Sequence, residues 1–299
     1  MWKKLLWTLI ILVFLLFWTL VKLPDDRIRG HLLTFIESTL DSQGIELRTE
    51  SSELRLFPTI RFKLVHGILR KEGTAVGSFD TFSIQPHLLH SLFSSSIHAS
   101  YAVEIGKGKA SGTLSFPRSF QKKSSASFSL DAVHFNIGAT GLPSVLGVSA
   151  QATLDGTLAL EMNVWNDPST LIGKSALRIT GLITEPQSIA GFSVPKLEVD
   201  SGEIIFQAQK GTMTLTNVHL SKLDSFKDLF LKIQGDIHLG QNLSLSTLNL
   251  HTVCALSETA KKSFPLIDTL LSAGKKPDDS YAFAINGTFE QPIPTPEGT

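Results

Sequence analysis

The sequence predicts a mainly β protein: an N-terminal transmembrane helix and an amphipathic helix, followed by an elongated, curved antiparallel sheet with a few short helices. Three observations support this fold class. Residues 5–21 are almost entirely apolar, residues 28–40 repeat apolar side chains at helical spacing, and from residue 45 onward apolar and polar side chains alternate with period two. The hydrophobic content of 42% is sufficient for a folded core, which excludes wholesale disorder.

The first segment, residues 1–22, is predicted to be an uncleaved membrane anchor. Lys3 and Lys4 precede the apolar run 5–21, which as a helix would extend roughly 25 Å. The alternative is a cleavable signal peptide, but no pair of small residues that would mark a cleavage site follows the run. The charges on its two sides are nearly balanced. The short N-terminal tail and the long polar remainder favour export of the body.

The second segment is predicted to be an amphipathic helix that begins at Pro24-Asp25 and ends near Gly44. Aspartate accepts hydrogen bonds from the free amides at a helix start, and glycine is a common terminator. Between them Ile28, Leu32, Ile36 and Leu40 recur every four residues. We expect this stripe to pack on the domain that follows; the alternative is a helix that lies on a bilayer surface.

The body of the chain is predicted to consist of strands with one apolar and one polar face. Alternation of this kind is clear in residues 60–64, 101–105, 229–239 and 281–289. In residues 148–164 it continues through Asp155-Gly156, a pair that often forms a hairpin turn. A turn there would place the apolar faces of its two arms on opposite sides. We therefore predict one long strand with a bend or bulge at the glycine.

Two shifts of the alternation predict β-bulges. The apolar positions are even at Phe128 and Leu130 but odd at Phe135, and they are odd at Met213 but even at Val218. Short helices are expected at 86–93 and at 257–274, where a proline should interrupt or restart the helix. Ser- and Lys-rich residues near 117–125 suggest a boundary. The predicted organisation is an anchor (1–22), a helix with a first β region (23–117), a long-strand β region (118–290) and a flexible, proline-rich tail (291–299).

Composition and motifs argue against several classes of function. Lys and Arg together number 27, as do Asp and Glu, and no basic patch is interleaved with aromatic residues, so we expect no nucleic-acid partner. The one cysteine, Cys254, excludes an intrachain disulfide and lies among apolar residues, as an inert thiol does. His87 and His90 have the spacing of two metal ligands on a helix but lack further ligands in the sequence, which favours ordinary surface histidines. We expect no catalytic residue, metal or cofactor, and therefore no enzyme.

A resemblance to a known family is carried by residues 23–112. It consists of Leu23-Pro24, the amphipathic helix, Ile45-Glu46-Leu47, the stretch Leu54-Arg55-Leu56-Phe57-Pro58-Thr59-Ile60-Arg61-Phe62, Val65-His66-Gly67-Ile68, and Pro86-His87-Leu88-Leu89-His90-Ser91-Leu92-Phe93 before the strand 97–105. This region resembles the N-terminal part of AsmA-like proteins of Gram-negative envelopes. With its single span and its length, the chain most resembles the type II secretion system protein N (GspN-like) group.

The resemblance implies a single-pass bacterial inner-membrane protein whose body lies in the periplasm. It also implies a non-enzymatic accessory role in type II protein secretion, with secretion-apparatus proteins as partners. The alternative is an AsmA-like lipid-handling or outer-membrane homeostasis module that binds phospholipid or other acyl chains in an apolar β groove. The following residues are expected on the face of such a groove: Val148, Leu154, Leu158, Leu160, Met162, Leu231, Ile233, Phe283 and Ile285. A sandwich of two sheets would bury the same face and leave no groove.

Overall fold

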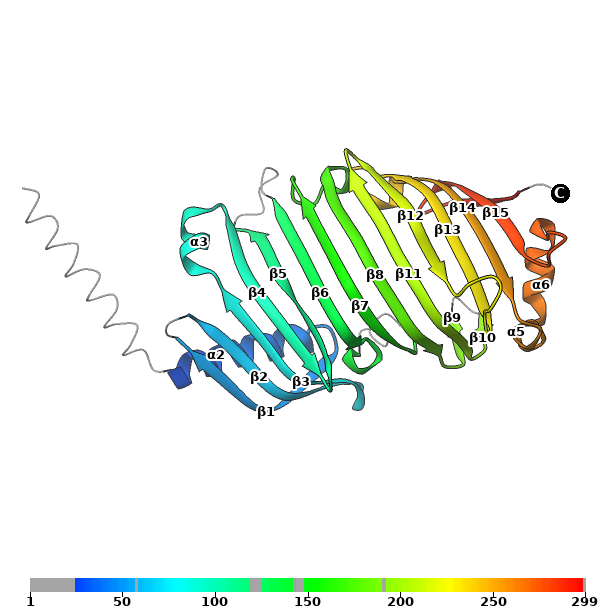
Figure 1. The fold of residues 1–299 in the computed structure, drawn as a ribbon. Coiled ribbons are helices and arrows are strands. Elements are labelled where there is room, and N and C mark those ends of the chain that lie inside the picture. Colours follow the sequence, from blue (N-terminus) through cyan, green and yellow to red (C-terminus); the bar gives the residue numbers. More distant parts are fainter. Residues whose placement is uncertain are drawn as a thin grey trace, which may run out of the picture.

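The computed structural model describes residues 25–56, 59–118, 125–141, 143, 148–189 and 192–297. Fourteen strands form one antiparallel sheet in the order β1-β2-β3-β4-β5-β6-β7-β8-β11-β12-β13-β14-β15-β16, and β9 and β10 form a separate small hairpin. Figure 1 shows this sheet as one long, twisted layer. The prediction of a mainly β fold is therefore confirmed, and the described strands do not form the alternative two-sheet sandwich.

The strands of the first half are β1 (Ile45–Arg55), β2 (Arg61–Lys71), β3 (Thr74–Pro86), β4 (Ser96–Ile105), β5 (Gly108–Pro117), β6 (Ala126–Asn136), β7 (Ala150–Met162) and β8 (Leu171–Thr184). Those of the second half are β9 (Gln187–Ile189), β10 (Phe192–Val194), β11 (Leu197–Gln209), β12 (Thr212–Leu220), β13 (Leu229–His238), β14 (Thr247–Leu256), β15 (Tyr281–Thr288) and β16 (Pro292–Pro296). The helices are α2 (Asp25–Asp41), α3 (Leu88–Phe93), α5 (Glu258–Ser263) and α6 (Pro265–Leu271), with short 3-10 turns η1 (Gly138–Thr140), η2 (Pro168–Thr170), η3 (Leu243–Leu245) and η4 (Ser272–Gly274).

Helix α2 packs on the first strands, as its apolar stripe predicts. Leu32, Leu33, Ile36 and Leu40 pack against a buried cluster made by Leu47, Phe62 and Leu64. The prediction that this stripe packs on the domain that follows is thus confirmed. The predicted anchor, residues 1–22, lies outside the described residues, and none of the helices within them is both long and apolar enough to cross a membrane.

The segment predicted to be one long strand is β7, and it runs without a turn through Asp155-Gly156. Gly156 has φ +117°, and a side chain there would meet the carbonyl oxygen of Ala176 on β8. A glycine is therefore required at this point because the neighbouring backbone approaches too closely for a Cβ.

Both shifts in the alternation are bulges. The pairing of β6 with β7 shifts between Ala132 and Phe135, and that of β12 with β13 shifts between Leu215 and Val218. Each bulge returns the apolar side chains to one face of the sheet, because the extra residue restores the alternation. The expected helix at 257–274 is also divided at its proline, into α5 and α6.

The strand pairing extends across two of the expected boundaries. Residues 291–299 were expected to be a flexible tail, but Pro292–Pro296 form the edge strand β16 and pair with β15. The amide of Glu297 donates to the carbonyl oxygen of Ala282 at 3.0 Å, which extends this pairing one residue beyond β16. Across the expected boundary near residue 117, β5 pairs with β6, so the sheet is continuous.

Candidate apolar binding face

Strand register places eight of the nine residues predicted for the groove on one face of the sheet. On β7, Leu154, Leu158, Leu160 and Met162 alternate with polar residues. Leu158 lies opposite Ser175, which lies opposite Phe206 on β11. The same face continues through Leu215, Gly235 and Leu250 to Ile285 on β15. Leu231, Ile233 and Phe283 have the same parity on their strands.

Val148, the ninth residue, precedes β7 and is not placed by strand register. Its amide donates to the carbonyl oxygen of Pro143 at 2.8 Å, and its side chain is half-buried. Leu154 is buried, with 9% of its surface exposed, within a cluster that includes Phe135 and Ala132. The other seven side chains are half-buried. The sequence prediction therefore identifies residues that share a face. It does not distinguish the buried Leu154 from the seven half-buried residues.

The apolar face is covered by described helices only near its two ends. Figure 1 shows α2 beside β1–β3 and the pair α5–α6 beside the last strands, with no helix along β6, β7, β8, β11 and β12. The connection η1 adds local cover, since it contacts β3 and β7. The half-burial of Leu158 and Leu160 on the central strands follows from this arrangement, because neighbours within the sheet cover them only from the sides.

A cavity of about 470 Å³ lies under α2 and is almost entirely apolar. Phe35, Ile36 and Leu40 of the helix form one wall. The sheet contributes Leu47, Leu64, Leu69, Phe79, Phe82, Val103, Ile105 and Phe135. Its volume is within the range of about 300–1,000 Å³ that small-molecule sites occupy. Sequence reasoning did not find this cavity; the helical stripe and the alternation of 60–64 and 101–105 predict apolar walls but not the space between them.

A smaller apolar cavity of about 260 Å³ lies under α5 and α6. Phe264, Ile267 and Leu271 face Leu229, Leu231 and Cys254 across it. Burial raises the pKa of the Cys254 thiol, which lowers its thiolate fraction at neutral pH. This agrees with the interpretation of Cys254 as an unreactive thiol.

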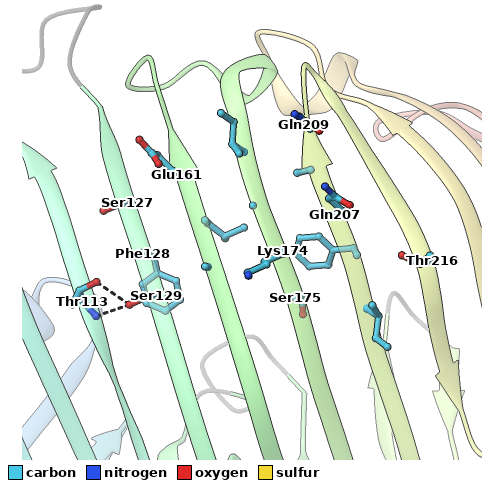
Figure 2. A pocket seen from close by; sticks show the side chains of 17 residues that line it. Thr113, Ser127, Phe128, Ser129, Glu161, Lys174, Ser175, Gln207, Gln209 and Thr216 are labelled. Atoms are coloured by element: carbon cyan, nitrogen blue, oxygen red, sulfur yellow. Dashed lines mark hydrogen bonds between the residues drawn. The ribbon is translucent and has the colours of Figure 1, made fainter.

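The opposite face of the sheet carries a shallow depression of about 710 Å³ that is lined by both polar and apolar residues. Figure 2 shows its lining, which crosses β5 to β12 and includes Lys174, Glu161 and Gln207. The backbone amide of Thr113 donates to the Ser129 hydroxyl at 2.8 Å, and the Thr113 hydroxyl is also 2.8 Å from it. These contacts join neighbouring strands and do not form a nucleophile with an adjacent base.

His87 and His90 contact different partners. The His87 Nε2 is 2.6 Å from the Ser100 hydroxyl, whereas the His90 ring lies 4.2 Å from the ring of His98 in an edge-on arrangement. Burial, together with the charges of His90 and His87, lowers the pKa of His98. Within the described part of the chain no group of three His, Cys, Asp or Glu side chains is arranged to hold a metal ion.

Comparisons of the chain with protein-family models, with curated proteins and with solved structures gave no match.

Proposed function

We propose that the chain is a non-enzymatic, membrane-anchored lipid-handling protein of the bacterial periplasm that holds acyl chains against the apolar face of its sheet. One observation carries this proposal. The apolar face is continuous over the fourteen-stranded sheet, while described helices cover it only near the ends.

The dimensions and chemistry of the open part suit an acyl chain. From β5 to β12 there are five spacings between neighbouring strands, which at about 4.8 Å each amount to roughly 24 Å. This exceeds the roughly 15 Å of hydrocarbon in one bilayer leaflet. Removal of apolar surface from water stabilises the bound state by about 25 cal/mol per Å² and needs no directional contacts. Such binding selects for an apolar chain and tolerates varied headgroups.

A second proposal, an accessory role in type II secretion with apparatus proteins as partners, rests on the family resemblance of residues 23–112. The open apolar face also fits a protein partner, because exposed apolar surface commonly marks protein contacts. The two proposals differ in what touches the centre of the face, and one experiment separates them.

The test is photo-crosslinking with the full chain in cells. A photoreactive amino acid replaces Leu158, which is half-buried on the apolar face, and in the matched control it replaces Thr157, which is exposed on the polar face. Lipid-mass adducts at position 158 and none at 157 are expected. A protein adduct at 158 in place of lipid would support the secretion proposal. Equal labelling at both positions, or no adduct at 158, would overturn lipid binding.

A further inference from the structure

Four large apolar side chains are exposed at one corner of the sheet, which we call the α3 corner. Leu88 and Phe93 lie on α3, and they are 48% and 92% exposed. Ile97 on β4 and Phe116 on β5 lie opposite each other in the ladder, and each is 47% exposed. Single exposed apolar residues are common on protein surfaces, but a group at one place indicates an interaction surface.

Hydrogen bonds hold α3 in a fixed position on the sheet. The amide of His87 donates to the carbonyl oxygen of His98 at 2.8 Å, and the amide of His98 donates to the hydroxyl of Ser91 at 2.9 Å. The guanidinium of Arg118 donates to the carbonyl oxygen of Ser91, which is itself buried. Phe93 is therefore presented to solvent by a well-anchored helix.

The α3 corner is at the same end of the strands as the start of α2. Arg29, in the first turns of α2, donates from its guanidinium to the carbonyl oxygen of Ser52 at 3.2 Å, near the end of β1. The strand pairs at this end of the sheet are Arg55 with Arg61 and Pro86 with Ala99, and α3 follows directly after Pro86. Figure 1 shows α3 and the start of α2 at the same end of the molecule.

The chain that enters α2 has a composition suited to a bilayer. The apolar run 5–21 ends four residues before Asp25. Four residues span at most about 14 Å even when fully extended. The α3 corner is therefore close to any membrane that this run enters. Three exposed arginines, Arg55, Arg61 and Arg118, lie at the same end, together with the acidic residues Glu53 and Asp26, of which Asp26 pairs with Arg29. Guanidinium groups suit the anionic headgroups of such a surface.

We propose that the α3 corner docks on the lipid bilayer that receives residues 5–21, with Phe93 and Leu88 inserted at the level of the headgroups. Ile97 and Phe116 belong to the apolar face, because the same register places Ala99 opposite Leu114 and Tyr101 opposite Gly112. Docking therefore brings the apolar face to the membrane surface. The proposal does not depend on lipid binding at the centre of that face, and a different measurement tests it.

The experiment uses the full chain with Cys254 replaced by Ala, reconstituted into vesicles of phosphatidylethanolamine and phosphatidylglycerol. A polarity-sensitive fluorophore is attached at Phe93→Cys or, as control, at Leu245→Cys. Leu245 is 62% exposed but lies on η3, between β13 and β14, toward the other end of the sheet. Brominated lipids in the vesicles quench a fluorophore that reaches the acyl chains.

We expect at least threefold stronger quenching at position 93 than at 245, with a blue-shifted emission at 93 only. Equal quenching at the two positions would overturn the proposal. Failure of the chain to float with the vesicles would overturn it as well. A blue shift of the fluorophore at position 93 that occurs only after a crude envelope extract is added, without quenching by the brominated lipids, would assign the corner to a protein partner in place of lipid.

Discussion

Phe135 on β6 lies directly opposite Leu154 on β7, although the preceding pair in the ladder is Ala132 with Gly156. Two residues of β6 therefore face one residue of β7. His134, inside this bulge, has φ +48°, and its amide donates to the Asp155 carboxylate at 2.7 Å. Without the bulge Phe135 would point to the polar face, since side chains alternate along a strand.

The first prediction concerns this bulge. Phe135 is 7% exposed, so Phe135→Ala should lower the free energy of unfolding by about 3 kcal/mol through lost burial and a cavity. Val133, two residues earlier, is 52% exposed on the opposite face, and Val133→Ala should change stability by about 0.5 kcal/mol or less. Urea denaturation of both variants measures the difference. Equal effects would contradict the assignment of the two faces.

The second prediction concerns two glycines with opposite constraints. At Gly156 a Cβ would lie 2.1 Å from the Ala176 carbonyl oxygen and the backbone has positive φ, so Gly156→Ala should destabilise the protein by about 2 kcal/mol or more. At Gly30, within α2, a Cβ meets no atom within 4 Å, and Gly30→Ala should stabilise by about 0.5–1 kcal/mol. Thermal unfolding of the two variants provides the test. A harmless alanine at position 156 would mean that β7 and β8 are less closely apposed than described.

The strands and their common face follow from the sequence because a period of two is a local property. Positions 148–164 and the shift at Phe135 contain enough information to predict a strand, a bulge and a face. The cavity under α2, in contrast, depends on residues that are far apart in the sequence. It requires Phe35 on the helix and Phe79 on β3 to be held apart by a distance that no single segment encodes.

The edge strand β16 was not predicted, because the prolines of residues 291–299 suggested a loose tail. Prolines disfavour central strands but are compatible with an edge, where one side of the strand has no partner. The exposure of Phe93 was not predicted either. In the sequence 86–93 its position resembles that of any apolar residue of a short helix, and only the anchoring of α3 by Ser91 and Arg118 determines which side faces solvent.

The third prediction concerns pH. Asp279 forms ion pairs with Lys261 and Lys275, and these lysines lower the pKa of its carboxyl to about 2 from the usual 3.8. A carboxyl with a lowered pKa stabilises the folded state above its ordinary pKa, and this contribution is lost as the pH falls toward 2. Because Lys261 belongs to α5, protonation should loosen α5 from the turn before β15.

The variant Asp279→Asn lacks this contribution at every pH. Its urea midpoint should therefore lie below that of the wild type from pH 5 to 7, and the difference should shrink between pH 4 and pH 2. The variant Lys261→Met and the double variant complete a cycle that isolates the coupling of the pair. A difference that stays constant down to pH 2 would show that the Asp279 carboxyl contributes nothing through its charge.

The fourth prediction concerns the edge strand β16, which carries a proline at every second position. Pro292, Pro294 and Pro296 alternate with Ile293 and Thr295. The amide of Glu297 points to β15, and by alternation the amides of residues 293 and 295 do so too. The nitrogens of the three prolines therefore face the free edge, which has no N–H donors at these positions. An edge of this kind is protected against pairing with another chain.

Replacement of the three prolines by threonine restores three outward donors on a strand that keeps its pairing with β15. The variant should associate through β16 at concentrations where the wild type does not, and sedimentation velocity in detergent measures the change in mass. As a control, Pro265→Ala alters a helix start and leaves the edge intact, so its mass should equal that of the wild type. An unchanged mass for the triple variant would show that something other than the prolines protects this edge. In that case β16 would expose free N–H donors and still not pair with another chain.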